Sequence, residues 1–246
     1  MREKLYILLI FCIIANTTTF AQKSKVKNLP TYEDVPIQFG ISMGLSTIDF
    51  IFKRNLFVGE TGSIIVPEVA KLGSGIHFNI NSDFRLGNYF RFRILPGIIL
   101  SNRYVSFWSS INGPDTLINN EPINISSNFV EMPFLIKYKA KRVNNYAPYL
   151  IAGVNPRFDI EGKKNSNINK NQAIVLKQWD FYFEMGIGID FYNQYFKFAP
   201  ELKLSLGLLD ILNHNSSYTS TGNSTNYINS IEKLNSKLVM LTFHFE

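Results

Sequence analysis

The chain has 246 residues, of which 46% are hydrophobic and 14% aromatic, and its formal net charge is +6. The basic residues are spread along the chain rather than clustered, so we do not expect a nucleic-acid-binding surface. The only cysteine, Cys12, falls in a segment that we expect to be removed. This excludes disulfides, thiolate metal sites and cysteine nucleophiles from the mature chain.

Residues 1–21 have the pattern of a cleaved export signal. Arg2 and Lys4 precede an apolar run of residues 5–15, which is too short to cross a membrane as a helix. Small residues at Thr19 and Ala21 predict cleavage directly after Ala21. Residues 22–35 then carry several lysines followed by two acidic residues. We expect this segment to be a solvated periplasmic leader, with docking onto a partner as the alternative.

From residue 36 onward, apolar and polar residues alternate in about eight segments. In residues 180–191, every odd position is apolar, whereas the even positions are acidic, small or, at Tyr182, aromatic. A period of two separates these two sets on opposite faces of a strand, whereas a helix would mix them. The predicted segments are 38–46, 76–85, 90–103, 130–141, 149–160, 180–191, 197–208 and 238–245.

The connections between these segments alternate in length. Tight turns are predicted at 86–88, 143–145 and 192–194, and long Asn-, Ser-, Thr- and Gly-rich loops near 52–73, 106–127, 162–175 and 210–234. Short periplasmic turns and long outer loops are typical of outer-membrane barrels, and aromatic residues near the segment ends would form girdles at the membrane boundaries. No stretch after the signal approaches the ~18 apolar residues of a membrane-spanning helix.

We therefore predict an all-β protein, with residues 36–246 forming a closed antiparallel transmembrane β-barrel of about eight strands in the cell outer membrane. Both termini would lie on the periplasmic side. The alternative is a soluble β-sandwich or lipocalin-like barrel, in which the charged face would point outward. Proline donates no hydrogen bond to a strand ladder, so we expect bulges or strand ends at five positions. These are Pro96, Pro133, Pro148, Pro156 and Pro200.

The polar face of the predicted barrel carries charges of both signs. An eight-strand barrel is just wide enough to be filled by side chains, and charges away from bulk water need partners. We expect a structural ion-pair network rather than a charged translocation path. Its predicted members are Asp83, Arg91, Arg93, Arg103, Glu131, Lys137, Lys139, Arg157, Glu184, Asp190, Glu201 and Lys203.

The sequence has no recognisable catalytic, metal-binding or nucleotide-binding motif. The three histidines are His77 and His244, which have inward parity, and His214, which falls in a predicted loop. We expect no cofactor, no small-molecule substrate and no enzymatic activity. A lipid-modifying enzyme that uses His77 or His244 is a minor alternative. Gly186 and Gly188 are expected to be small residues on a crowded inward face.

Several stretches together resemble one protein family. They are SDFRLGNYFRFRILPG at 82–97, VEMPFLIKY at 130–138, KRVNN at 141–145, DFYFEMGIGIDF at 180–191, YFKFAPELK at 195–203 and NLP at 28–30. In order and spacing they are similar to the PorT family, outer-membrane components of the Por (type IX) secretion system, which is associated with gliding motility and surface protein export. The resemblance spans nearly the whole mature chain.

This resemblance implies a non-enzymatic accessory or assembly component of type IX secretion that contacts outer-membrane lipid and other envelope proteins. It supplies no catalytic residue. A stand-alone structural or surface-binding barrel is the alternative. Neither the residues nor the resemblance identifies the partners.

Overall fold

The structure is a computed structural model that describes residues 26–55, 64–110, 116–117, 122–161, 176–213 and 230–246. The predicted signal segment 1–21 and His214 lie outside these residues. Among the described residues, no helix combines the length and the apolar character needed to cross a membrane.

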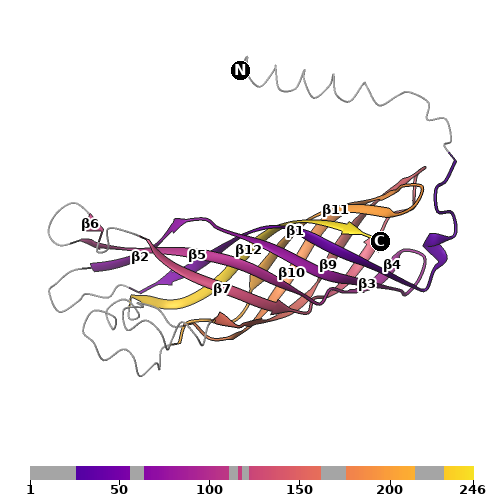
Figure 1. Cartoon of the computed structure of the whole chain (residues 1–246). Helices are drawn as coiled ribbons and strands as arrows, with labels where there is room; N and C mark the ends of the chain where they lie inside the picture. Colours follow the sequence, from indigo (N-terminus) through magenta and orange to yellow (C-terminus); the bar gives the residue numbers. More distant parts are fainter. Residues whose placement is uncertain (1–25, 56–63, 111–115, 118–121, 162–175, 214–229) are drawn as a thin grey trace, which may run out of the picture.

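The described strands form one antiparallel sheet that closes on itself (Figure 1). The first strand pairs with the last, Leu45 lying opposite Leu241. The wall consists of β1 (Ile37–Arg54), β3 (Gly73–Arg85), β4 (Phe90–Ile94) with β5 (Gly97–Ser110), β7 (Ile123–Glu131) with β8 (Phe134–Lys139), β9 (Tyr146–Asp159), β10 (Trp179–Tyr192), β11 (Lys197–Gly207) and β12 (Ile231–Phe245). When β4 with β5 and β7 with β8 are each counted once, these give eight wall positions. The predicted closed barrel is confirmed.

The two ends of the barrel differ. We call the end with the tight turns 86–89, 140–145 and 193–196 the turn end, and the described N-terminal segment and the C-terminus lie there (Figure 1). At the opposite end, which we call the loop end, β2 (Ile64–Lys71) and β6 (Thr116–Leu117) pair with the extension of β5. The predicted loops 52–73 and 106–127 are therefore partly strand.

The prolines affect the sheet less than expected. Pro96 separates β4 from β5 and Pro133 separates β7 from β8, which confirms strand ends at these two positions. The register is nevertheless the same on both sides of each break. The carbonyl oxygens of both prolines still accept hydrogen bonds from the neighbouring strand or segment. Ile80 N donates to Pro96 O (2.9 Å), and Leu95 N donates to Pro133 O (3.2 Å).

The same expectation is wrong at Pro156 and Pro200. β9 and β11 run through these residues without a register shift, and Pro148 lies near the beginning of β9. A proline removes one donor, but the antiparallel ladder tolerates the loss where the neighbouring pairs stay in register.

The alternation explains most of the wall. Odd-numbered residues of β1 such as Phe39 and Ile41 are exposed on the outer face, and even-numbered residues such as Ser42 and Ser46 are buried inside. Toward the loop end the inward face also becomes apolar, with Ile48 buried in β1. Because both faces of the sheet are apolar there, the alternation disappears, and the pattern did not reveal that β1, β5 and β12 continue beyond the predicted segments.

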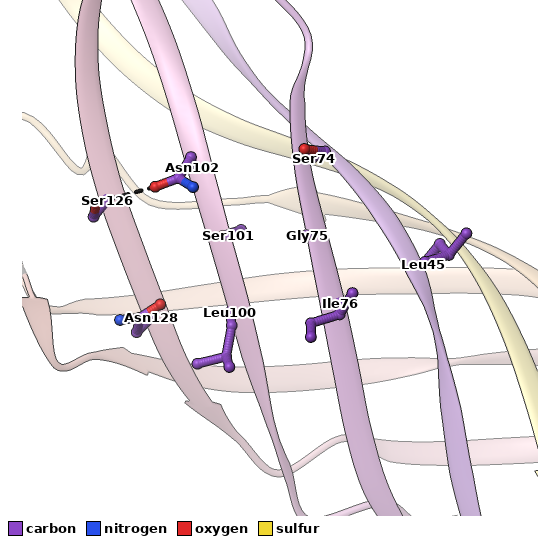
Figure 2. Close-up of a pocket in the computed structure, with 9 residues that line it drawn as sticks. All are labelled: Leu45, Ser74, Gly75, Ile76, Leu100, Ser101, Asn102, Ser126 and Asn128. Carbon is purple, nitrogen blue, oxygen red and sulfur yellow. Dashed lines mark hydrogen bonds between the residues drawn. The ribbon is translucent and has the colours of Figure 1, made fainter.

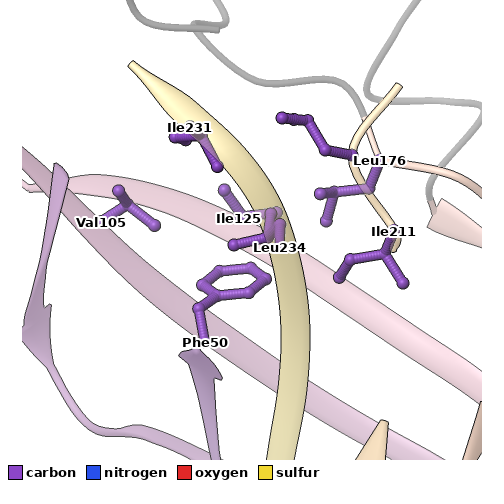
Figure 3. Close-up of a cluster of buried hydrophobic side chains, with 8 residues drawn as sticks. Phe50, Val105, Ile125, Leu176, Ile211, Ile231 and Leu234 are labelled. Carbon is purple, nitrogen blue, oxygen red and sulfur yellow. The ribbon is translucent and has the colours of Figure 1, made fainter. Parts of the chain in front are cut away.

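The loop-end interior is a hydrophobic cluster (Figure 3). It contains Phe50, Val105, Ile125, Leu176, Ile211, Leu212, Ile231 and Leu234. None of the twelve residues of the predicted ionic network belongs to this cluster, so the interior changes from ionic to apolar at the loop end. The side chains here exclude water instead of pairing charges, and burial of apolar area stabilises this end by about 25 cal/mol per Å².

Candidate functional site

All twelve charged residues of the predicted network point into the barrel and are buried. Their exposed fractions range from 0% for Asp83 and Arg93 to 6% for Lys139. They come from β3, β4, β5, β7, β8, β9, β10 and β11, and the interior is the candidate site. The members are Asp83, Arg91, Arg93, Arg103, Glu131, Lys137, Lys139, Arg157, Glu184, Asp190, Glu201 and Lys203.

A first cluster lies nearer the turn end and is centred on Arg93. Its Nε and Nη2 atoms donate to Asp83 at 2.5 and 2.7 Å, a bidentate arrangement that both orients and strengthens the pair. Arg93 Nη1 is 3.2 Å from Glu201 Oε2. Beside it, Lys137 Nζ donates to Asp190 at 2.8 Å and lies 3.8 Å from the centre of the Tyr149 ring.

A second cluster lies further toward the loop end and is centred on Arg157. Its Nε donates to Glu131 and its Nη2 to Glu184, both at 2.8 Å. The Asn155 amide also donates to both carboxylates at 2.8 Å, and Lys203 Nζ is 3.0 Å from Glu184. Two carboxylates are thus held between two cations and one amide, and this pairing offsets much of the cost of burying the charges.

Arg103 marks the boundary between the ionic and the apolar interior. Its guanidinium lies 4.7 Å from the Phe50 ring centre and 5.0 Å from that of Phe129, and Nη1 donates to Ser236 at 2.9 Å. Stacking against aromatic faces is a way for a desolvated guanidinium to retain favourable electrostatics.

Some members of the interior were not among the predicted set. Lys197 pairs with Glu246 and donates to Gln38 at 3.0 Å, and Tyr149 donates to Glu201 at 2.9 Å. Lys197 has the inward parity of its segment, so the alternation contained a signal for it. Glu246 follows the last strand residue and offered no such signal.

One hydrogen-bonded chain has the order of a catalytic triad. Ser42 Oγ is 2.6 Å from His244 Nδ1, and His244 Nε2 is 3.2 Å from Glu201 Oε2. All three residues are at most 2% exposed, and Arg93 Nη1 lies 3.4 Å from the same Nε2 atom. His77, likewise buried, contacts Thr242 at 2.9 Å. Ser42, His244 and Glu201 are therefore continuous with the ionic cluster around Arg93.

The described part of the leader, residues 26–35, has no buried residue and is mostly exposed, but several of its residues contact the turn-end rim. Gln38 donates to Tyr32 O at 2.6 Å, and Lys139 donates to the Glu33 carboxylate. Partial burial would raise the pKa of the Glu33 carboxyl, but the hydrogen bond and charge of Lys139 outweigh it and hold the pKa below its usual range. Arg142 donates to Asn28 O at 2.5 Å.

The outer face carries a continuous apolar band. On β10 it runs from Trp179 to Phe191. At about 3.3 Å per residue and a strand tilt of about 45°, this stretch spans about 28 Å along the barrel axis, close to the ~25 Å apolar band of outer-membrane barrels. Aromatic rings lie at both limits, including Phe90 packed on Tyr138 (5.2 Å) and Trp179 on Phe158 (5.1 Å).

A groove of about 560 Å³ interrupts the outer wall near the loop-end limit of this band (Figure 2). It is lined by small or polar side chains between leucine and isoleucine, and Ser126 donates to Asn102 at 3.0 Å across it. Within the described residues there is no group of three or more His, Cys, Asp or Glu side chains that could hold a metal ion.

Comparisons with known proteins find similarities to solved structures and to one protein family. Solved structures with a similar fold include Ail, the attachment invasion locus protein of Yersinia pestis, in complex with the heparin analogue sucrose octasulfate (10% identity, 86% of this chain and 99% of that chain, TM-score 0.38). Neisserial surface protein A is 8% identical over 85% of this chain and 97% of that chain, with a TM-score of 0.40. AlkL in lipid bilayers is 8% identical over 93% of this chain and 95% of that chain, with a TM-score of 0.43. These similarities are too low to carry a functional argument.

No curated relative matches the sequence. A family model described as an outer membrane protein beta-barrel domain matches residues 20–213, which is most of the chain. The protein therefore belongs to the outer-membrane β-barrel domain family, which indicates the outer membrane as its location.

Proposed function

We propose that the protein is a non-enzymatic outer-membrane barrel that acts through contacts of its ends with other envelope proteins, as an accessory or assembly component of type IX secretion. The observation that carries the non-conducting part of this proposal is the filled interior. Arg93 and Arg157 are both fully buried, and the loop-end hydrophobic cluster lies beyond them.

Cargo would have to pass two successive layers in this barrel. The two ionic clusters fill the middle, and the hydrophobic cluster fills the loop end. Breaking one buried ion pair costs about 3–5 kcal/mol, so a passage that separates several of them has no compensating gain. Secreted polypeptide would therefore cross the membrane elsewhere.

The secretion role itself rests on the resemblance to PorT, and the fold adds one supporting feature. Much of the similar sequence gathers at the turn end: residues 28–30 in the leader, 82–97 around the β3–β4 turn, 141–145 in the β8–β9 turn and 195–203 around the β10–β11 turn. We infer that the turn end faces the periplasm, as short turns do in bacterial barrels, and that partners bind there.

An in-frame deletion with complementation tests this proposal. Cargo of the type IX system should accumulate in the periplasm of the deletion strain while outer-membrane integrity is retained. Complementation with Lys141→Glu at the turn end should restore export poorly, whereas Lys177→Glu at the loop end should restore it fully. Normal export in the deletion strain would contradict the secretion role.

A second candidate function is surface binding, favoured by the strands that continue past the closed barrel. β2, β6 and the end of β5 form a sheet at the loop end (Figure 1). If this sheet is the functional surface, deletion of residues 111–121 should abolish surface binding and leave export unchanged.

A lipid-modifying enzyme remains the minor alternative because of the Ser42–His244 contact. We expect Ser42→Ala to leave lipid A and phospholipid acylation unchanged, because the hydroxyl is sealed in the interior. A changed lipid profile in this variant would contradict the non-enzymatic proposal.

A further inference from the structure

A small pocket on the turn-end rim gathers an excess of positive charge. The pocket has a volume of about 200 Å³ and lies between the leader and the turns that connect β3 to β4 and β8 to β9. We call it the rim pocket. Five of its lining residues are cationic and two are acidic, the cations being Arg85, Arg91, Lys139, Lys141 and Arg142.

The two carboxylates of the rim pocket are already engaged. Glu33 accepts from Lys139, and Asp34 lies 3.1 Å from Arg85. Three cations, Arg91, Lys141 and Arg142, then have no carboxylate partner among the described residues: Arg142 donates only to carbonyl and amide oxygens, and Lys141 is exposed. The pocket therefore keeps a net positive charge after its internal pairs are counted.

Arg91 supplies an independent observation. The side chain is only 5% exposed, and its Nη2 atom donates to the Glu33 carbonyl at 2.8 Å. Its Nη1 atom is buried and has no hydrogen-bond partner in the described part of the chain. A buried guanidinium nitrogen without an acceptor is costly, and an anion in the adjoining pocket would relieve that cost.

The position of the rim pocket relative to the membrane indicates which anion it could bind. Tyr89 lines it, and Phe90, next in the chain, belongs to the aromatic limit of the apolar band. Lipid phosphates lie just outside the apolar part of a bilayer, at this level. The β10–β11 turn, residues 193–196, reads Asn-Gln-Tyr-Phe and carries no charge. The positive charge is thus concentrated beside the β3–β4 and β8–β9 turns.

We propose that the rim pocket binds the phosphate of an anionic phospholipid headgroup in the leaflet at the turn end. Guanidinium groups match phosphate oxygens in geometry as well as charge, and basic pockets at a membrane boundary are typical headgroup sites. Arg91 would donate from its unsatisfied nitrogen, and exposed Lys141 would supply the second charge. This inference does not depend on the secretion role.

Native mass spectrometry of the full-length protein, purified from outer membranes in detergent, tests the inference. The measured quantity is bound phosphatidylglycerol relative to bound phosphatidylcholine, each added at equal concentration. The variants are Lys141→Gln, which alters an exposed side chain, and Arg91→Gln. Lys177→Gln is the matched control, since Lys177 is an exposed lysine at the loop end. Heat-dependent gel mobility verifies that each variant folds.

The wild type and Lys177→Gln should prefer phosphatidylglycerol, and each rim variant should lower this preference about fivefold per charge removed. Equal binding of the two lipids, or an equal loss in Lys177→Gln, would overturn the inference. Competition identifies the source of the anion. If inorganic phosphate displaces the lipid as well as glycerol phosphate does, free phosphate is the ligand and the lipid assignment fails. Stronger displacement by a polyglutamate peptide would indicate an acidic protein partner instead.

Discussion

The Lys137–Asp190 pair allows a quantitative test of the lumenal network. Both side chains are at most 1% exposed, and Lys137 Nζ lies 2.8 Å from Asp190 Oδ1. We consider Lys137→Met and Asp190→Asn, which remove one charge each with little change in volume, and the double variant that contains both.

The two single variants should differ in cost. At an effective dielectric constant of about 20, two unit charges at this distance attract by about 6 kcal/mol, and this attraction offsets the desolvation of both ions. Lys137→Met leaves the buried Asp190 without its lysine, so we expect a loss of about 3–5 kcal/mol. Asp190→Asn should cost less, about 1–3 kcal/mol, because Lys137 keeps the Tyr149 ring at 3.8 Å and Asp83 at 4.0 Å.

The double variant should be more stable than the sum of the single effects predicts, by about 2 kcal/mol or more, since neither charge is then left alone. The assay is reversible urea unfolding in lipid vesicles, followed by tryptophan fluorescence and gel mobility. Lys53→Gln is the control, because its pair with Glu232 is exposed (65% and 51%) and should contribute less than about 1 kcal/mol. If the two effects simply add, Lys137 and Asp190 are not energetically coupled. If Lys137→Met costs no more than Lys53→Gln, the pair is not a buried ion pair, and either result would refute the reasoning.

Three further variants test other parts of the barrel. Gly188→Ala should destabilise the fold, because the added Cβ would lie 2.3 Å from Tyr149 Cζ. Gly87→Ala should be neutral, because a Cβ added there would have no neighbouring atom within 4 Å. Equal melting temperatures of the two variants would contradict this packing. Leu202→Arg, near the middle of the outer band, should cost about 2–4 kcal/mol in vesicles and Leu208→Arg, near its edge, about 0–1; equal costs would argue against a lipid-facing band. Glu33→Gln should loosen the leader at neutral pH, as measured by protease cleavage, by less than about 1 kcal/mol. Because the pKa of Glu33 is lowered in the folded state, its contribution is present above the ordinary value of 4.5 and is lost as pH falls through the folded pKa. The difference between wild type and Glu33→Gln should therefore vanish in acid, and a difference that persists there would refute the Lys139 contact.

The alternation of polar and apolar residues predicted which side chains point into the barrel, but not which of them pair. Each of the twelve predicted charged residues has an inward position, because parity along a strand determines the side of the wall. Parity does not determine partners. Arg157 lies between Glu131 and Glu184 because β7 and β10 both pair with β9, and the register of these pairings, which parity leaves open, brings the three side chains together. The Ser42–His244–Glu201 chain arises in the same way.

The alternation pattern could not predict the contacts of the leader or the structure of the loop end. Residues 28–34 have no periodicity, and their contacts with Arg91, Lys139 and Arg142 depend on three different strands or turns meeting at one rim. At the loop end, the continuation of β1 to Arg54 is hidden because Ile48 and Phe50 make the inward face apolar. A strand that is apolar on both faces gives no alternation to detect.

The sequence by itself determined the β-barrel class, the inside and outside of most strands and the alternation of short and long connections, because these are local consequences of side-chain period and turn chemistry. The tertiary structure alone decided which charges pair, where the interior changes from ionic to apolar, and that the leader contacts the turn-end rim. These features depend on the stagger with which eight strands close into a ring, and that stagger is a property of the whole sheet rather than of any one strand.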